Sequence, residues 1–278
     1  MSNESAMRDP QSNEPVEESS EQNKMPIMVG LFDVLGFSKR LETEGLENTV
    51  SLYNDLISTT VKKEAGWCSR FVNDGTGKYF PALIDLNIRY AYFSDTILLW
   101  HTLEKLYAAP FISYCATFFC EALALNVPVR GAIALGEAVM HRSIGTYIGQ
   151  PIIDAARLEG VQQWIGVSFA RSATWPPFLA ALDAQLIIEY DTPVKEGKTS
   201  LLSPVVLDWP RRWRELYGSS PSEQVLAMNE ATPHEYYGKT ISFIEHSKEN
   251  ENWFQRTEEE MKDARLRMNS QEPGGKRE

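Results

Sequence analysis

The spacing of apolar positions along the chain switches repeatedly between the two-residue period of a strand and the 3.6-residue period of a helix. The apolar run MPIMVGLFD is strand-like, and GFSKRL shortly after it opens a helix. A second helix follows from Leu46, and then come a hairpin, a buried helix and further strand and helix pairs. The predicted strands are 25–33, 82–93, 96–100, 129–140, 165–170, 186–190 and 201–207, and the predicted helices open near 36 and 46 and span 106–125, 151–163 and 177–184.

This order mixes strand hairpins with crossover helices. It therefore predicts an α+β sandwich of ferredoxin-like type, in which helices pack on a mixed or antiparallel sheet. The two ends are rich in Ser, Glu, Asn, Gln and Gly and have little to bury, so they are expected to be disordered. The predicted parts are a disordered acidic tail (1–24), a main domain (25–208), a helical extension (209–268) and a disordered tail (269–278).

The composition is that of an ordinary globular protein, with 43% hydrophobic and 23% charged residues among 278. A net charge of −11 argues against binding of nucleic acid through phosphate neutralisation, which needs basic patches. A nucleotide substrate stays possible because a divalent metal can carry the phosphate charge locally. There is no basic segment with an apolar stretch after it at the N-terminus, and the longest uncharged run, 106–120, is shorter than a bilayer span of roughly 20 residues. We expect a cytoplasmic protein that binds neither nucleic acid nor a membrane.

Two carboxylates fall at predicted strand ends. Asp33 closes the first apolar strand, and a Gly-containing turn leads from it into a helix whose free N–H groups suit a phosphate. Asp95 lies at the tip of the predicted hairpin. Carboxylates on neighbouring strands are what Mg²⁺ or Mn²⁺ needs, since these cations take oxygen ligands and share the substrate's phosphates. Taken alone, Asp33 could equally cap the helix and Asp95 could be a common turn residue.

Four motifs in sequence order resemble the class III adenylate and guanylate cyclases. The segment FDVLGFS around Asp33 resembles the FDIxGFT signature, and FSDT (93–96) resembles the hairpin that carries the second metal aspartate. VRGAIALGE (129–137) resembles the RxGIHxGE strand, and GQPIIDAARLE (149–159) resembles the GxxVNxAARLE helix. Together they are specific, whereas each alone would be weak. The resemblance implies a cyclase catalytic domain over 25–208 that turns a nucleoside triphosphate into a cyclic 3′,5′-monophosphate and pyrophosphate.

The resemblance also implies roles for individual residues. Asp33 and Asp95 match the metal carboxylates, with the backbone carbonyl of Val34 as a further ligand, for two Mn²⁺ or Mg²⁺ ions per active site. Arg157 matches the arginine that stabilises charge on the pentavalent transition state. In the family this arginine serves the partner's site, which implies a homodimer with two shared active sites and an inactive monomer. The ribose-orienting asparagine of the family is replaced here by Ile153.

The base-reading residues depart from those of purine cyclases. The family lysine falls on Arg89 and the family aspartate on Thr146, and the donors of Arg89 suit pyrimidine oxygens. The FDVLGFS start, the FSDT hairpin and the replacement of the ribose asparagine by Ile153 resemble the pyrimidine cyclases of bacterial anti-phage signalling systems, which activate a separately encoded effector. Tyr53 falls where those enzymes place a base-proximal tyrosine, and Phe37 is a further expected substrate contact. Arg89 could equally be a strand-edge ion-pair residue, and Tyr53 a core aromatic.

We therefore expect a lyase that makes cyclic UMP from UTP as the signal generator of an anti-phage defence system. A cytidylate cyclase and a purine cyclase remain enzymatic alternatives. A non-catalytic nucleotide-binding module is the alternative of another class, and Ile153 is its main support. Retention of Asp33, Asp95 and Arg157 counts against it, because a pure binding protein has no need of a transition-state arginine.

Overall fold

The computed structural model describes residues 24–67, 69–73, 79–83, 88–174 and 186–252. The predicted tails, apart from Lys24, and the helix predicted over 177–184 lie outside these residues.

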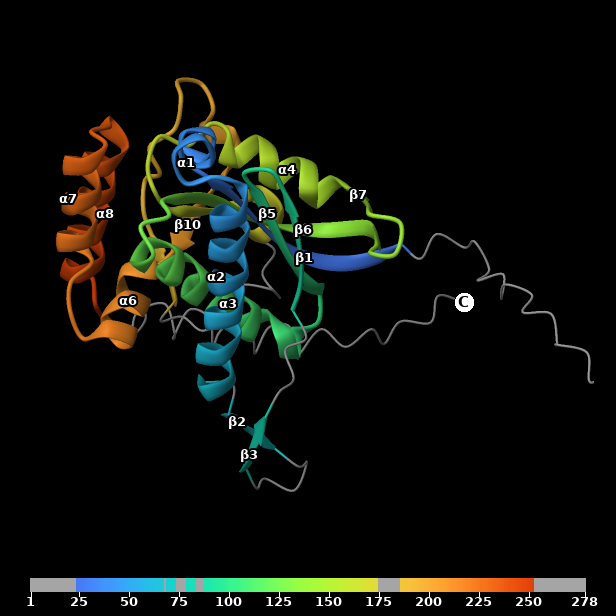
Figure 1. Ribbon diagram of the computed structural model, residues 1–278. Coiled ribbons are helices and arrows are strands. Elements are labelled where there is room, and N and C mark those ends of the chain that lie inside the picture. The colour runs from blue at the N-terminus through green and yellow to red at the C-terminus, as the bar shows by residue number, and fades with distance from the viewer. Residues whose placement is uncertain (1–23, 68, 74–78, 84–87, 175–185, 253–278) are drawn as a thin grey trace, which may run out of the picture.

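The core of the fold is an eight-stranded mixed sheet (Figure 1). Seven strands follow the order β4-β5-β1-β6-β8-β10-β9, and β7 pairs with β6 off this path. Strands β6 and β8 run parallel, whereas the other described neighbours are antiparallel. The strands are β1 (Met25–Val34), β4 (Arg89–Phe93), β5 (Thr96–Thr102), β6 (Val129–His141), β7 (Thr146–Gly149), β8 (Val167–Ala170), β9 (Ile187–Glu189) and β10 (Leu202–Leu207).

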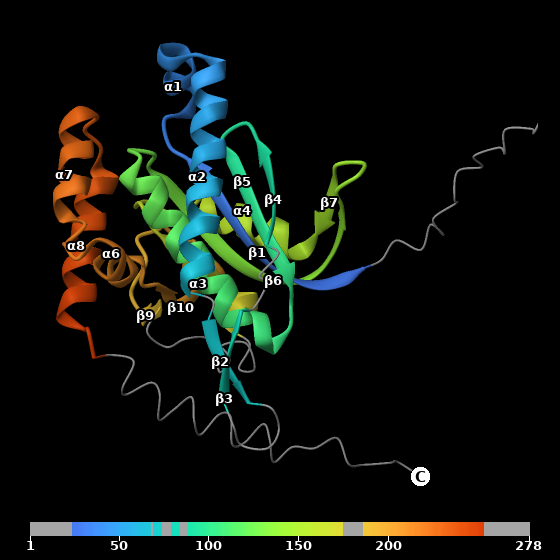
Figure 2. The same cartoon turned by 60° about the horizontal axis from the view of Figure 1, so that its bottom comes forward.

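Helices cover both faces of this sheet, so the predicted α+β class with helices on a mixed sheet is confirmed. The helices are α1 (Phe37–Glu44), α2 (Leu46–Trp67), α3 (Lys105–Ala124), α4 (Gln150–Glu159), α6 (Trp209–Tyr217), α7 (Ser222–Ala231) and α8 (Glu235–Glu249), with 3₁₀ turns at Arg171–Thr174 and Thr199–Leu201. In both views α2 and α3 lie side by side, and so do α7 and α8 (Figures 1 and 2).

The alternation of side chains along β1 creates two cores. Met28 and Phe32 pack with α2 and α3 on one face, and Val29 and Leu31 pack with α4 on the other. Because β1 is a central strand that is buried on both faces, its sequence MPIMVGLFD is a nearly continuous apolar run rather than an alternating one. Asp33 shares its face with Leu31 and therefore points to the α4 side.

Helix α3 is apolar on all sides because it fills the larger core. Its segment Leu106–Ala124 has the length and composition to cross a membrane, with 19 residues and a mean hydropathy of 1.3. This apolar segment is therefore longer than the uncharged run 106–120 on which the sequence-based prediction rests. Since 83% of its most apolar window is buried inside the fold, α3 has the character of a core helix.

Three boundaries differ from the sequence-based prediction. The single strand predicted over 82–93 is wrong: β3 (Tyr79–Leu83) pairs with β2 (Ser69–Asn73) in a separate two-stranded sheet, and β4 begins at Arg89. Apolar alternation does not specify which sheet a segment joins. The helix predicted over 151–163 ends at Glu159, with Gly160 as its C-cap. Strand β7 was not predicted, since its four residues pair only through the hairpin with β6.

The three C-terminal helices pack on the larger core. Trp209 and Phe243 are fully buried there, and the guanidinium of Arg212 lies 2.6 Å from the buried Glu64 carboxylate of α2. The division of the chain at residue 208 into a catalytic domain and a helical extension stays a prediction.

Candidate active site

The backbone brings Asp33 and Asp95 side by side. Asp33 is the penultimate residue of β1, and Asp95 lies in the two-residue turn between β4 and β5. The N–H of Val34 donates to the carbonyl oxygen of Asp95 at 2.8 Å, which joins the strand end to the turn. Ser94 has a φ of 57°, the left-handed conformation that tight hairpin turns require. The predicted hairpin with Asp95 at its tip is therefore present, and it abuts the end of β1.

The electrostatics of Asp33 reflect this arrangement. Burial raises the pKa of Asp33, Arg130 opposes that rise, and the nearby Asp95 carboxylate adds to it. The side chain of Asp33 remains 23% exposed, so solvent or a ligand can reach it. Two close carboxylates, one of them disfavoured as an anion, form a position where a cation is stabilised.

Arg130 on β6 is the cation that lies there within the chain. It pairs with Asp33 across β1 and β6, and its Nη2 lies 3.5 Å from Asp33 Oδ2. Its Nε donates to Glu159 Oε1 at 2.6 Å, and its Nη1 donates to the carbonyl oxygen of Gln162 at 2.9 Å. Burial raises the pKa of Glu159, and Arg130 opposes the rise. The guanidinium is thus held between two carboxylates.

A buried amide fixes the segment that supports Arg130. Gln162 is fully buried, and its Nε2 donates to the carbonyl oxygen of Gly131 at 2.8 Å. Its Oε1 accepts from Trp164 Nε1 and from Ser168 Oγ, both at 2.7 Å. Because every polar atom of this side chain is used, the backbone carbonyl that holds Arg130 has a defined position.

Sequence reasoning missed Arg130, Glu159 and Gln162 as site residues. Arg130 and Glu159 lie inside the two motifs quoted above, and a charged residue within an otherwise apolar run was the available signal. Gln162 gave no such signal, since it falls in a segment that was predicted to be helix and is not.

The turn between β1 and α1 suits an anion. Gly36 has a φ of 76°, which favours glycine, and it is the N-cap of α1 without a side-chain hydrogen bond. Leu35 N–H donates to Pro128 O at 2.9 Å and so fixes the turn against the start of β6. The first N–H groups of α1, beginning at Phe37, therefore have no side-chain cap.

Tyr53 and Phe37 meet beside the carboxylates. The Tyr53 ring lies edge-on to Phe37 and to Tyr92, with centroid distances of 6.1 and 5.6 Å. Tyr53 is 6% exposed, and its hydroxyl is buried without a hydrogen-bond partner within the described residues. Burial and then the charge of Asp95 raise the pKa of Tyr53. Tyr53 is thus a core aromatic with an unsatisfied hydroxyl close to Asp95, and an unpaired buried hydroxyl is a costly group to retain.

Three predicted site residues lie apart from this group. Arg89 is exposed at the start of β4 and pairs with Trp100 in register. Thr146 begins β7 on the β6–β7 hairpin. Arg157 is exposed on α4, and its side chain makes no hydrogen bond or ion pair within the described part of the chain. Within one chain, therefore, the predicted site residues that lie together are Asp33, Val34, Asp95, Phe37 and Tyr53. The predicted residues that lie apart from this group are Arg89, Thr146 and Arg157.

The donor set at Asp33 and Asp95 fits a divalent cation that shares its ligands with a substrate. Within the described residues no group of three or more His, Cys, Asp and Glu side chains is arranged to hold a metal ion. A cation here would take its remaining ligands from phosphate oxygens and water, as Mg²⁺ usually does. Burial and the neighbouring Asp95 carboxylate both raise the pKa of Asp33, and a cation bound here would oppose that rise.

Comparisons with known proteins give fold-level similarities only. No protein-family model and no curated protein matches the chain. A bacterial light-regulated adenylyl cyclase is similar at a TM-score of 0.45 and 14% identity, over 67% of this chain and 52% of that one, so the chain spans about half of it. The adenylyl cyclase CyaB from P. aeruginosa is similar at a TM-score of 0.44 and 13% identity, over 66% and 94%.

A third similar structure is the catalytic core of a rhodopsin-guanylyl cyclase with converted specificity in complex with ATPαS, with a TM-score of 0.44 and 10% identity over 66% and 96% of the two chains. Because all these TM-scores are below 0.5, no residue of this chain takes its role from them. The function is argued below from the chain's own residues.

Proposed function

We propose that this chain is a class III nucleotidyl cyclase that turns a nucleoside triphosphate into a cyclic 3′,5′-monophosphate and pyrophosphate. The observation that carries the proposal is the backbone-linked pair Asp33 and Asp95, next to the uncapped start of α1. Paired carboxylates and free helix N–H groups together suit a metal-bound triphosphate.

In the proposed reaction the ribose 3′-oxygen attacks the α-phosphorus, and the bond from that phosphorus to the oxygen bridging the β-phosphate breaks. The 3′-hydroxyl proton passes to solvent, and pyrophosphate leaves. Two Mn²⁺ or Mg²⁺ ions held by Asp33, Asp95 and the Val34 carbonyl would lower the pKa of the 3′-hydroxyl and neutralise phosphate charge. The N–H groups of α1 bind the phosphates, and catalysis is mainly positioning and electrostatics.

A homodimer with shared sites accounts for the position of Arg157. Helix α4 buries Ala155 and Leu158 against the sheet and turns Arg157 outward beside Ile153, which is 44% exposed. Exposed Ile144 and Ile148 lie on the β6–β7 hairpin, next to α4 in the chain. An outward arginine with exposed apolar neighbours suits a surface covered by a second copy, where Arg157 would reach the partner's triphosphate.

Uracil is the proposed base, with UTP converted to cyclic UMP. Tyr53 is the proposed base contact because its hydroxyl, unpaired among the described residues, lies near Asp95. A bound base would have to displace the Phe37 and Tyr92 rings that pack against it. The exposed Arg89 and the half-buried Thr146 offer no carboxylate to accept from the amino group of adenine. The proposed setting is cytoplasmic, as the signal generator of an anti-phage defence system with a separately encoded effector.

Four parallel incubations test reaction and base together. The purified protein with Mn²⁺ is given ATP, GTP, CTP or UTP, and products are separated and identified by mass. Cyclic UMP is the expected main product, with cyclic CMP second. Dominant cyclic AMP or cyclic GMP would overturn the base assignment alone, whereas no cyclic product from any substrate would overturn the reaction.

The non-catalytic module is favoured by one observation, the contact of Arg130 with Asp33, which partly satisfies that carboxylate within the chain. Tight nucleotide binding by the dimer with no pyrophosphate release would establish this second candidate. Pyrophosphate release that depends on Asp95 would exclude it.

A further inference from the structure

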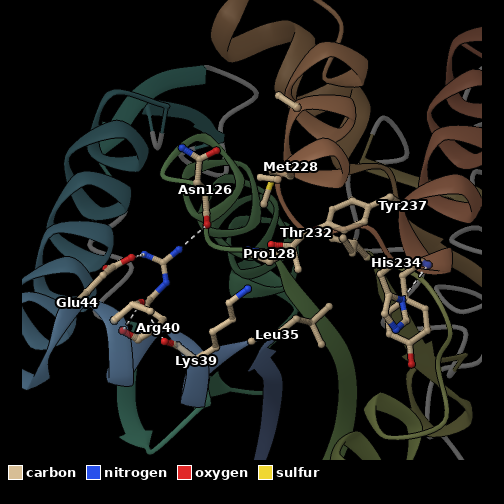
Figure 3. Close-up of a pocket in the computed structure, with 16 residues that line it drawn as sticks. Leu35, Lys39, Arg40, Glu44, Asn126, Pro128, Met228, Thr232, His234 and Tyr237 are labelled. Carbon is tan, nitrogen blue, oxygen red and sulfur yellow. Dashed lines mark hydrogen bonds and ion pairs between the residues drawn. The ribbon is translucent and has the colours of Figure 1, made fainter.

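A cavity of about 550 Å³ lies between α1 and the α7–α8 pair, outside the proposed catalytic group (Figure 3). Small-molecule sites typically have volumes of roughly 300–1,000 Å³. Neither Asp33 nor Asp95 lines it. Its walls come from α1, from the segments that precede β6 and β8, and from the ends of α7 and α8, including Leu35, Lys39, Pro128, Ile165, Met228 and Tyr237.

The walls combine apolar residues with polar ones such as Asn126, Thr232 and His234, and two cations on α1 also line the cavity. The Arg40 guanidinium is already bound, since it donates to both Glu44 carboxylate oxygens at 3.0 and 3.1 Å and to the carbonyl oxygen of Asn126 at 2.7 Å. The Lys39 ammonium makes no hydrogen bond or ion pair within the described residues, and in Figure 3 it extends into the cavity toward Pro128. Since Glu44 offsets Arg40, the cavity has one uncompensated positive charge.

We infer that this cavity binds a small organic monoanion, a single carboxylate, sulfonate or phosphodiester carried on an aromatic or apolar body. The body would cover apolar walls such as Met228 and Tyr237, and the anion would pair with Lys39. Lys39 is exposed at the edge of the cavity, where the anionic group of a bound ligand can reach it. One free cation matches a monoanion better than a triphosphate, which carries several charges.

The occupant would lie beside the turn that follows Asp33 and beside a neighbour of Arg130. Leu35 and Gly36 line the cavity and form the turn that follows Asp33. Tyr236 also lines it, and its ring centroid lies 5.7 Å from the guanidinium carbon of Arg130. Binding at this site does not depend on the proposed reaction, so the two can fail separately.

Two matched fluorescent probes test the inference. One is 8-anilinonaphthalene-1-sulfonate, an aromatic monoanion, and the other is N-phenyl-1-naphthylamine, which has the same rings without the sulfonate. The wild-type chain should bind the sulfonate about tenfold more tightly than the neutral probe. Lys39→Met should remove that preference and leave the affinity for the neutral probe within twofold, because Met keeps the length and apolar stem of the side chain.

Three further variants make the result specific to this cavity. Ala231→Trp and Ala227→Trp each place a large side chain in the cavity from an exposed position on α7, so both probes should lose binding. Lys62→Met, at an exposed lysine of α2, is the matched control and should change neither affinity. Folding of each variant is checked by circular dichroism. An undiminished sulfonate preference in Lys39→Met, or wild-type binding of both probes by the folded Trp variants, would overturn the inference.

Discussion

Asp33 combines partial burial with two charged neighbours of opposite sign. Burial raises its pKa most, Arg130 opposes that rise and Asp95 adds to it, so the pKa of Asp33 is raised overall. Neighbouring Val34 is buried and ties the strand end to the Asp95 turn. The position of the carboxylate is therefore set by backbone bonds, and its charge is set by side chains.

The first prediction concerns both carboxylates. Asp33→Asn or Asp95→Asn should lower cyclase turnover by at least about a hundredfold, the loss typical of removing one electrostatic stabiliser. Both side chains are partly exposed, so the thermal midpoint should change little. Turnover is measured with UTP and Mn²⁺. Asp55→Asn on the exposed face of α2 is the matched control and should retain full activity; full activity in either site variant would refute the metal assignment.

Glu159 is expected to position Arg130. In Glu159→Gln, Asp33 becomes the only carboxylate beside the guanidinium among the described residues, so Arg130 should pair with it more closely and compete with the metal ion. Turnover should fall roughly tenfold to a hundredfold, as for other residues that orient metal ligands. The half-saturating Mn²⁺ concentration should rise as well. Glu245→Gln, on the exposed side of α8, serves as control, and an unchanged Mn²⁺ dependence in Glu159→Gln would contradict the positioning role.

At the scale of elements, the start of α6 rests on a buried carboxylate. Asp208 is the N-cap of α6, and its Oδ1 accepts from Arg211 N–H at 3.3 Å and from Ser247 Oγ of α8 at 2.6 Å. Burial raises the pKa of Asp208 to about 6 despite these bonds. The cap thus joins two helices through a carboxyl group whose burial disfavours its charged form.

The sign of the pH effect follows from this shift. The folded chain binds the Asp208 proton more tightly than the unfolded chain, whose pKa is near 3.8, so the unfolding free energy falls as pH rises from about 4 to about 6. The contribution is roughly 2–3 kcal/mol, fully lost above pH 6. Asp208→Asn, which keeps the capping oxygen, should remove this contribution. Urea unfolding of both proteins at pH 4, 5, 6 and 7 measures the difference, and parallel pH profiles would rule the assignment out.

The sequence pattern correctly predicted those elements whose presence depends on local residue spacing. The long strand that ends beside Asp33, the buried helix α3 and the hairpin around Asp95 each have a period or turn residue that sequence alone displays. The short strand β7 and the division between β3 and β4 depend on which distant strand a segment pairs with. No local period encodes that choice.

The residues of the candidate site also fall into those that local sequence features predict and those that only packing brings together. Asp33 and Asp95 could be found because strand ends and hairpin tips are local features. Glu159 and Arg130 are 29 residues apart in the sequence, so their ion pair forms only once α4 has packed on β6. The unpaired hydroxyl of Tyr53 and the cavity beside Lys39 likewise arise from packing.

At the scale of the whole molecule, Arg130 is the cationic side chain that contacts Asp33 within one chain, among the residues that the structure describes. Arg157 faces outward, with Ile153 beside it. A two-fold dimer that pairs the outward face of α4 with the partner's β1 end would supply this arginine twice, once to each site.

The last prediction tests this shared site by complementation. If Asp33 and Arg157 of one site come from different protomers, Asp33→Ala and Arg157→Ala homodimers each have two defective sites. In a mixed dimer one site has both substitutions, and the other has a wild-type Asp33 and a wild-type Arg157. Equal co-expression makes half of the dimers mixed with one intact site each, so activity should return to about a quarter of wild type.

Two different affinity tags isolate the mixed dimer, because a tight dimer does not exchange subunits readily. The doubly purified species should then have about half of the wild-type activity per dimer, since one of its two sites is intact. A mixture of the two homodimers, purified separately and combined without exchange, is the control and should stay inactive. If the doubly tagged dimers are as inactive as their parents, Arg157 does not act across the interface, and its outward position on α4 has another cause.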